Sequence, residues 1–75
     1  MAVGDLQRIV GKNLRAHRLA LGLSQEAFAD RLGVHRTYLG GLERGERNLT
    51  LQSLERLAQQ LGVGILEIFQ CPSDQ

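Results

Sequence analysis

The chain has 75 residues and can form one small domain at most, because domains usually contain about 100–200 residues. Hydrophobic residues make up 43% of it, too many for a disordered chain. Its fourteen leucines and few aromatic residues favour helices over strands. Because so small a body leaves little room for a catalytic cleft, the composition argues against an enzyme and favours a binding module.

The residue types that build disulfide and metal sites are scarce. One cysteine, Cys71, excludes an intramolecular disulfide framework, and with only two histidines beside it the chain lacks the four ligands of a structural zinc site. We therefore expect no metal, no cofactor and, without room for a sensor domain, no small-molecule ligand. The longest apolar run is far shorter than the ~20 residues that span a bilayer, and no signal peptide is apparent. The sequence predicts a cytoplasmic protein, away from membranes, with Cys71 as a free thiol.

The net charge of the whole chain is only +1, but its distribution is uneven. Residues 1–47 carry eight basic and five acidic residues, a net charge of +3, whereas residues 48–75 have a net charge of −2. Eight of the nine basic residues are arginine, whose planar guanidinium matches phosphate groups and guanine edges. A bias of this size is also typical of an ordinary solvated face, so charge alone only suggests a polyanionic partner.

Apolar residues at helical spacing predict a first helix that ends at Gly22. Its expected inward stripe consists of Leu6, Val10, Leu14 and Leu21, with Asn13 and His17 on the same side. Ser24 is predicted to cap a second helix, which runs to Leu32 and stops at Gly33. These two helices are therefore separated by a short connection.

A third helix is predicted from residue 35 or 36 to residue 44, with Leu39 and Leu42 facing inward. Gly40 and Gly41 inside this helix each cost about 1 kcal/mol relative to alanine, so tertiary packing must hold it.

Thr50 is expected to cap a fourth helix, which ends at Gly62. Its expected inward stripe consists of Leu51, Leu54, Leu57, Ala58 and Leu61. A fifth short helix, at about residues 64–70, contains the four large apolar residues Ile65, Leu66, Ile68 and Phe69. A monomer of this length cannot bury all four, so we expect this helix to form a homodimer interface. The whole chain, residues 1–75, thus forms one all-α domain.

Residues 25–44 are the informative part, because two helices joined by a short glycine-containing turn make a helix-turn-helix unit. Gly33 provides the turn. The second helix of the unit would present His35, Arg36, Thr37 and Tyr38 from its N-terminal end, the part that enters a DNA major groove in this motif.

The spacing of these residues resembles that of the Cro/cI-like, or XRE, family of helix-turn-helix regulators over about residues 8–69. The matching residues are Leu14-Arg15, Arg18, Gly22-Leu23-Ser24-Gln25-Glu26, Phe28-Ala29, Leu32-Gly33-Val34, Leu42-Glu43-Arg44-Gly45, Leu57-Ala58 and Leu61-Gly62-Val63. Residues 36–38, Gly41 and residues 43–48 also resemble controller proteins of restriction–modification systems, which are small homodimeric transcription regulators. His35 stands where those proteins more often carry an aspartate or another good N-cap, so the resemblance implies a weaker or more basic start of the third helix. The resemblance implies a five-helix, lambda-repressor-like DNA-binding domain that binds a palindromic operator.

The resemblance also implies a role for individual residues. The DNA bases would be contacted by Arg36, Thr37, Tyr38 and His35, and the phosphates by Gln25, Arg47, Asn48 and Ser53. A largely buried ion pair between Arg18 and Glu43 would tie the first helix to the third. The fifth helix would supply the dimer contact.

Two alternatives stay open from the sequence. Tyr38 could pack its ring on a neighbouring helix instead of reaching DNA, and Arg36 could be an ordinary solvated residue. The whole domain could also be a protein-interaction module, an adaptor or antitoxin component, because a fold alone does not determine function. Salt-sensitive binding to DNA would discriminate between the two classes.

Overall fold

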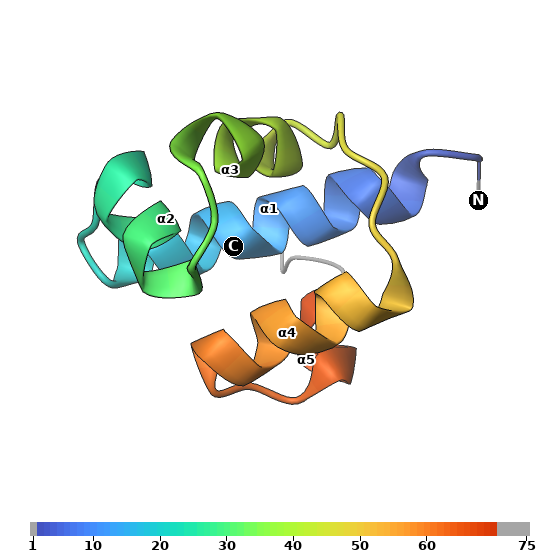
Figure 1. Cartoon of the computed structure of the whole chain (residues 1–75). Coiled ribbons are helices and arrows are strands. Elements are labelled where there is room, and N and C mark those ends of the chain that lie inside the picture. Colours follow the sequence, from blue (N-terminus) through green and yellow to red (C-terminus); the bar gives the residue numbers. More distant parts are fainter. Residues whose placement is uncertain (1, 71–75) are drawn as a thin grey trace.

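The structure, a computed structural model, describes residues 2–70 and contains five α-helices and no strand in that range (Figure 1). The helices are α1 (Asp5–Ala20), α2 (Gln25–Leu32), α3 (Arg36–Glu43), α4 (Leu51–Leu61) and α5 (Ile65–Phe69). α1 crosses the middle of the molecule and packs against α3 on one side and α5 on the other. α2 contacts α3 and α4, and α4 contacts α5. The predicted all-α, five-helix fold is confirmed, while Cys71 lies outside the described residues.

All five helices contribute to one hydrophobic core. Its largest fully buried side chains are Phe28, Leu14, Leu39, Leu42, Ile68 and Val10. No helix among the described residues is both long enough and apolar enough to cross a bilayer. Many of the apolar residues of the chain are thus used to fill a core that the five short helices form together.

The starts of α2 and α4 follow from their capping residues. The Ser24 hydroxyl accepts a hydrogen bond from the Ala27 amide at 3.1 Å, and the Thr50 hydroxyl accepts one from the Ser53 amide at 3.0 Å. Each bond satisfies an amide that has no partner within its helix. Both predicted N-caps are thus confirmed.

The turn between α2 and α3 is built on Gly33, which has a φ of 73°. The amide of Gly33 donates to the Asp30 carbonyl at 3.2 Å, and the amide of Val34 donates to the Ala29 carbonyl at 3.0 Å. These are the two bonds of a Schellman motif, which requires a left-handed residue and therefore favours glycine. Val34 packs onto the core beyond the turn, and this fixes where α3 begins.

Three leucines expected to face inward are exposed, so the predicted stripes of the first and fourth helices were too long. Leu6 is 48% exposed, Leu21 is 45% exposed and Leu51 is 74% exposed. All three lie at or just beyond the end of a helix, where no neighbouring element covers them. The central residues of the same stripes, such as Leu14 and Leu54, are buried as expected.

Ile68 was predicted to lie in a dimer interface on the fifth helix, and this prediction was wrong. Its side chain is 1% exposed and belongs to the core of the single chain. Ile65 and Phe69 are half-buried against the same core, and only Leu66, at 76% exposure, faces away from it. α5 buries more than expected because it packs against both α1 and α4. The Asn13 amide also donates to the carbonyls of Ile68 and, at 2.8 Å, Gln70, which ties the end of α5 to α1.

α1 and α3 approach each other closely at Gly11, a residue that the sequence patterns did not identify. A Cβ atom at this position would lie 2.7 Å from the Glu43 carbonyl oxygen and closer still to that of Leu42. Both obstacles are backbone atoms, so only glycine permits this crossing. Gly11 thereby sets the distance of α3 from the rest of the molecule.

Candidate nucleic-acid interface

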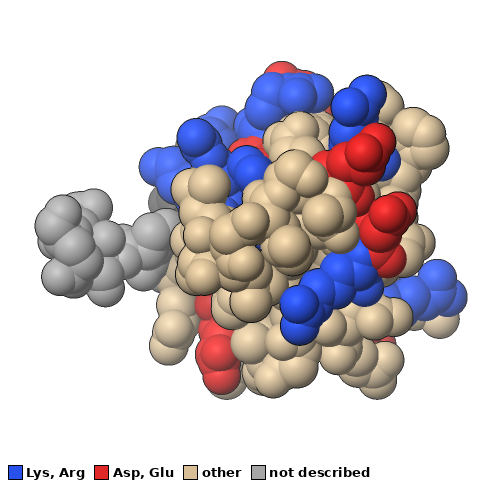
Figure 2. All heavy atoms as spheres, turned by 90° about the vertical axis from the view of Figure 1, so that its left-hand side faces the viewer, with Lys and Arg blue, Asp and Glu red and all other residues tan. Residues whose placement is uncertain are grey.

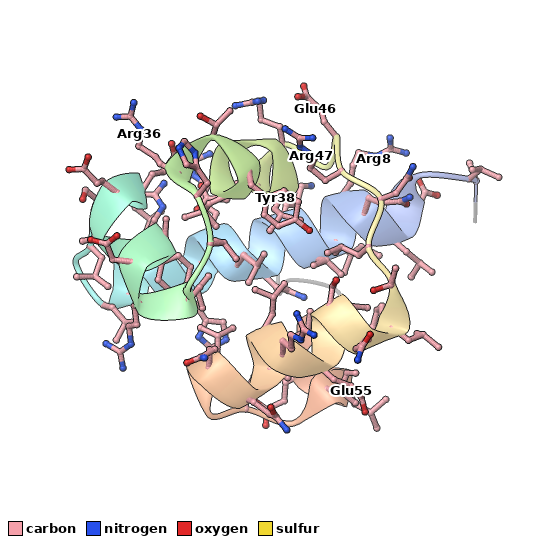
Figure 3. The ribbon with its side chains drawn as sticks, in the orientation of Figure 1. Arg8, Arg36, Tyr38, Glu46, Arg47 and Glu55 are labelled. Carbon is pink, nitrogen blue, oxygen red and sulfur yellow. The ribbon has the colours of Figure 1, made fainter. Side chains whose placement is uncertain are left out.

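The N-terminal end of α3 presents an exposed polar group of His35, Arg36 and Thr37. The Arg36 side chain extends away from the body of the molecule (Figure 3) and makes no ion pair within residues 2–70. His35 caps the helix itself, because its Nδ1 accepts a hydrogen bond from the Thr37 amide at 3.1 Å. His35 thus supplies a side-chain cap, and the expectation that this helix start is weaker or more basic than one capped by aspartate stays a prediction.

Tyr38 lies on the inner side of the same helix. Its ring is half-buried and packs against the core, as in the packing alternative considered above. The guanidinium carbon of Arg47 lies 5.6 Å from the centre of the ring, within the range of a cation–π interaction. The structure thus brings together two of the predicted site residues, one from α3 and one from the loop that follows it.

The predicted ion pair between α1 and α3 is present and is the centre of a small buried network. Arg18 donates from Nε to Glu43 Oε2 at 2.8 Å and from Nη2 to Oε1 at 3.1 Å. The Arg18 side chain is 13% exposed and that of Glu43 is 4% exposed. Gln25 Nε2 also donates to Glu43 Oε1 at 3.1 Å, and Arg18 Nη1 donates to the Leu23 carbonyl at 3.1 Å. The network fixes α1, the start of α2 and the end of α3 relative to one another.

The remaining predicted phosphate contacts lie around this helix in different settings. Asn48 is exposed in the loop after α3, and its Oδ1 accepts a hydrogen bond from Gln7 Nε2 at 3.4 Å. Ser53 is half-buried at the start of α4, where its hydroxyl oxygen accepts a hydrogen bond from that of Thr50 at 3.0 Å. Ser53 also lines a hollow of about 350 Å³ together with Tyr38, and Arg36 is not among the residues that line it.

Arginine side chains gather on the α3 side of the molecule. Figure 2 looks onto the side that lies at the left of Figure 1 and shows Lys and Arg concentrated toward the top of that face. Arg15 and Arg44 line a further hollow of about 270 Å³ beside Gln25. Both belong to the sequence pattern of the family resemblance, but neither was predicted to contact DNA. The spacing of Arg15 and Arg18, three residues apart on one helix, was the available signal. Arg44 is partly neutralised by Glu46, whose Oε1 lies 3.0 Å from its Nε.

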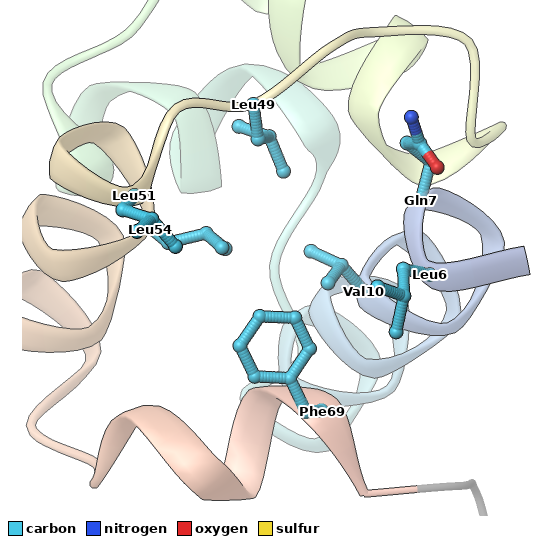
Figure 4. A pocket seen from close by; sticks show the side chains of 7 residues that line it. All are labelled: Leu6, Gln7, Val10, Leu49, Leu51, Leu54 and Phe69. Atoms are coloured by element: carbon cyan, nitrogen blue, oxygen red, sulfur yellow. The ribbon is translucent and has the colours of Figure 1, made fainter. Parts of the chain in front are cut away.

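A second exposed surface is apolar and lies near the start of α1 and α4. A hollow of about 180 Å³ is lined by Leu6, Gln7, Val10, Leu49, Leu51, Leu54 and Phe69 (Figure 4). The exposed leucines at its rim, Leu6 and Leu51, are two of the three leucines that were wrongly predicted to be buried. α5 contributes Phe69 to this hollow and carries the exposed Leu66.

Comparison with known proteins agrees with this arrangement. A family model described as helix-turn-helix (HTH_3) matches residues 14–68. The chain is 44% identical to the control protein C.SmaI of Serratia marcescens over 61 residues, which cover 81% of this chain and 73% of the relative. It is similar in structure to the restriction–modification controller protein C.AhdI of Aeromonas hydrophila, with a TM-score of 0.74 and 43% identity, covering 84% of this chain and 96% of the other. It is also similar to the controller protein C.Esp1396I, solved as a tetramer in complex with its natural 35 base-pair operator, with a TM-score of 0.69 and 36% identity, covering 87% and 96%.

Proposed function

Because this chain belongs to the helix-turn-helix (HTH_3) family, we propose that it is a transcriptional regulator that binds double-stranded DNA by placing the N-terminal end of α3 in the major groove. The observation that carries this proposal is the exposed end of α3, where Arg36 and Thr37 follow directly on the rigid turn at Gly33. Arg36 is free of ion pairs within the described residues, so its guanidinium is available to a polyanion. Since the partner is DNA, we expect the protein in the cytoplasm, at the nucleoid.

Within this proposal the bases are contacted by Arg36 and Thr37. The planar fork of Arg36 can donate to both acceptors of a guanine, which contributes about 1–3 kcal/mol of discrimination against another base. Thr37 offers a hydroxyl and a methyl group to a neighbouring base. His35 stands beside them, and its free Nε2–H can donate because Nδ1 is occupied as the helix cap.

The phosphate contacts are proposed for Gln25, Arg47 and Asn48, which surround the recognition helix. Gln25 lies in the first turn of α2, where the helix amides and dipole also favour an anion. One of its amide hydrogens is bonded to Glu43, so the other is the one available to a phosphate. Such contacts orient the protein on the duplex and carry no sequence information.

We further propose that two chains bind a palindromic operator as a homodimer, in the manner of a restriction–modification controller. The relative C.Esp1396I assembles on its operator as a tetramer, and the apolar hollow of this chain with the exposed Leu66 and Leu51 is a surface on which a second copy can pack. A two-fold dimer would place its recognition helices about 34 Å apart, one turn of the duplex.

The proposal is tested by comparing variants on two kinds of DNA at one salt concentration. A duplex selected from a random pool by the parent chain serves as operator, and a random-sequence duplex serves as reference. Arg36→Ala should reduce the operator-to-random affinity ratio by roughly ten-fold or more, because a base contact is lost. Asn48→Ala should weaken binding to both duplexes by similar factors. Asn48 is a cleaner phosphate-contact variant than Gln25, since Gln25 also donates to Glu43. An unchanged ratio for Arg36→Ala would contradict the assignment of base readout to α3.

A further inference from the structure

The loop after α3 is held by a defined backbone turn. The amide of Glu46 donates to the Gly41 carbonyl at 2.9 Å, and the amide of Gly45 donates to the Leu42 carbonyl at 3.0 Å. Gly45 has a φ of 76°, as this Schellman motif requires. The turn reverses the chain, so that Arg47, two residues after Gly45, lies against α3.

This turn differs from the corresponding turns of the molecule in how its exit is anchored. After α1, α2 and α4 the residue that follows the left-handed glycine is apolar and packs on the core, namely Leu23, Val34 and Val63. After α3 that residue is Glu46, which is exposed. The side chain that contacts α3 from this loop is instead that of Arg47.

Arg47 fits across α3 because position 41 is a glycine. A Cβ atom on Gly41 would lie 2.8 Å from Arg47 Nε and 3.0 Å from Arg47 Cγ. The arginine stem thus occupies the space that any other residue at position 41 would fill, and its guanidinium then lies over the Tyr38 ring (Figure 3). The adjacent Gly40 is different, since a Cβ atom there would lie 3.2 Å from Nη1 at the far end of Arg44 and at an ordinary contact distance of 3.8 Å from Gln25 Oε1.

We propose that Gly41 and Tyr38 are positioning residues, which hold the Arg47 guanidinium beside the recognition helix before DNA arrives and present it to a backbone phosphate. This inference rests on the proposed DNA-binding function. A long exposed arginine normally loses conformational freedom when it binds, and a side chain already confined by a neighbouring ring and helix loses less. The glycine at position 41, costly for an isolated helix, is then explained by the side chain that crosses it.

The assignment gives Tyr38 a role different from base readout. The ring face supports Arg47, whereas the hydroxyl has no part in that contact. Tyr38→Phe should therefore keep the arginine in place, and Tyr38→Leu should release it. If Tyr38 instead read a base through its hydroxyl, Tyr38→Phe would lower the affinity for DNA although Arg47 stays in place.

The first test compares Gly41→Ala with the matched control Gly40→Ala in DNA binding. Both variants add one methyl group to the same helix and raise its helix propensity. The probe is a labelled random-sequence duplex of roughly 30 base pairs, which is long enough for two half-sites. Gly41→Ala should lower the affinity for this duplex by a factor of roughly two to ten for each protomer that is bound. Gly40→Ala should remain within about two-fold of the parent, since only a mobile nitrogen must move.

The same substitution in an Arg47→Ala background shows whether the effect acts through Arg47. Gly41→Ala should cause no further loss there, because the side chain that it displaces is already absent. An equal loss in both backgrounds would mean that the new methyl group disturbs DNA or the helix directly, and this would overturn the proposal.

A second measurement needs no DNA. The order of the Arg47 Nε–H bond, measured by NMR relaxation in the free protein, should exceed that of Arg31, an exposed arginine of α2 without an ion pair in the described residues. Gly41→Ala and Tyr38→Leu should lower Arg47 to the level of Arg31, and Tyr38→Phe should not. An ordered Arg47 in a chain that binds no duplex would contradict the proposed function alone, whereas an Arg47 as mobile as Arg31 would contradict the positioning role.

Discussion

At the scale of single residues, the buried Glu43 carboxylate is the centre of the polar network on which the stability of the fold depends most. It accepts hydrogen bonds from Arg18 and Gln25 while its side chain is 4% exposed. Removing Arg18 leaves this charge buried without its main partner, so Arg18→Ala should lower the free energy of unfolding by about 3–5 kcal/mol. Urea unfolding measures the change, with the exposed Arg15→Ala as control.

The double variant Arg18→Met/Glu43→Leu separates the cost of an orphaned charge from the value of the pair. Replacing both charges by apolar side chains of similar size should recover most of the stability lost in Arg18→Ala. If Arg18→Ala unfolds at the same urea concentration as Arg15→Ala, the network does not contribute to stability as described.

Gly11 controls the contact between α1 and α3 through backbone atoms. In Gly11→Ala the new methyl group would collide with the carbonyls of Leu42 and Glu43, which cannot turn aside as a side chain can. The helices must separate, and overpacking of this kind costs about 1–3 kcal/mol. This loss should exceed the gain of about 1 kcal/mol in helix propensity, so thermal unfolding should occur at a lower temperature than in the parent. Gly40→Ala, which gains the same propensity, should unfold at the parent's temperature or higher.

At the scale of elements, the N-terminal end of α3 has two roles, because His35 caps the helix there and the same end is proposed to bind DNA. His35 caps the helix through Nδ1, although aspartate caps helices well and also favours the helix dipole. His35→Asp should therefore raise the free energy of unfolding by about 0.3–1 kcal/mol and weaken DNA binding, because it adds a negative charge beside the phosphates. His35→Asn should cap without that charge and bind more tightly than His35→Asp. Equal DNA affinities of the two variants would show that residue 35 lies away from the duplex.

Helix boundaries were predictable because their signals are local. Ser24 and Thr50 begin helices and Gly33 and Gly62 end them, and each acts within four residues of its own position. Burial was less predictable, because it depends on which element lies opposite. Ile68 is buried because α5 packs against both α1 and α4, and no pattern within residues 64–70 contains that information.

The candidate site shows the same division. The exposed end of α3 followed from the motif, since the turn at Gly33 fixes which residues begin the helix. The stacking of Arg47 on Tyr38 across Gly41 did not, because it depends on the path of a loop. Arg15 and Arg44 likewise meet beside Gln25 only in the folded chain.

At the scale of the whole molecule, the proposed dimer surface consists of a few exposed leucines around the apolar hollow near α5. Leu66 is 76% exposed on α5, and Leu19, at 58% exposure on α1, serves as a matched control outside this surface. Leu66→Glu removes one leucine from each half of a two-fold interface and should weaken the dimer by about 3–6 kcal/mol. Sedimentation at tens of micromolar should show monomer for Leu66→Glu and dimer for Leu19→Glu. A parent chain that sediments only as monomer, with and without DNA, would contradict the dimer.

The central claim, that this domain acts by binding DNA, is tested most directly by the salt dependence of its affinity for a duplex. Each arginine that neutralises a phosphate contributes about −0.9 to the slope of log affinity against log salt concentration. A dimer that places both Arg47 side chains on phosphates should give a slope of about −2 or steeper, and Arg47→Ala should flatten it by about 2. A folded parent chain that shows no salt-dependent affinity for the selected duplex would contradict the claim and favour a protein-interaction module of the same fold.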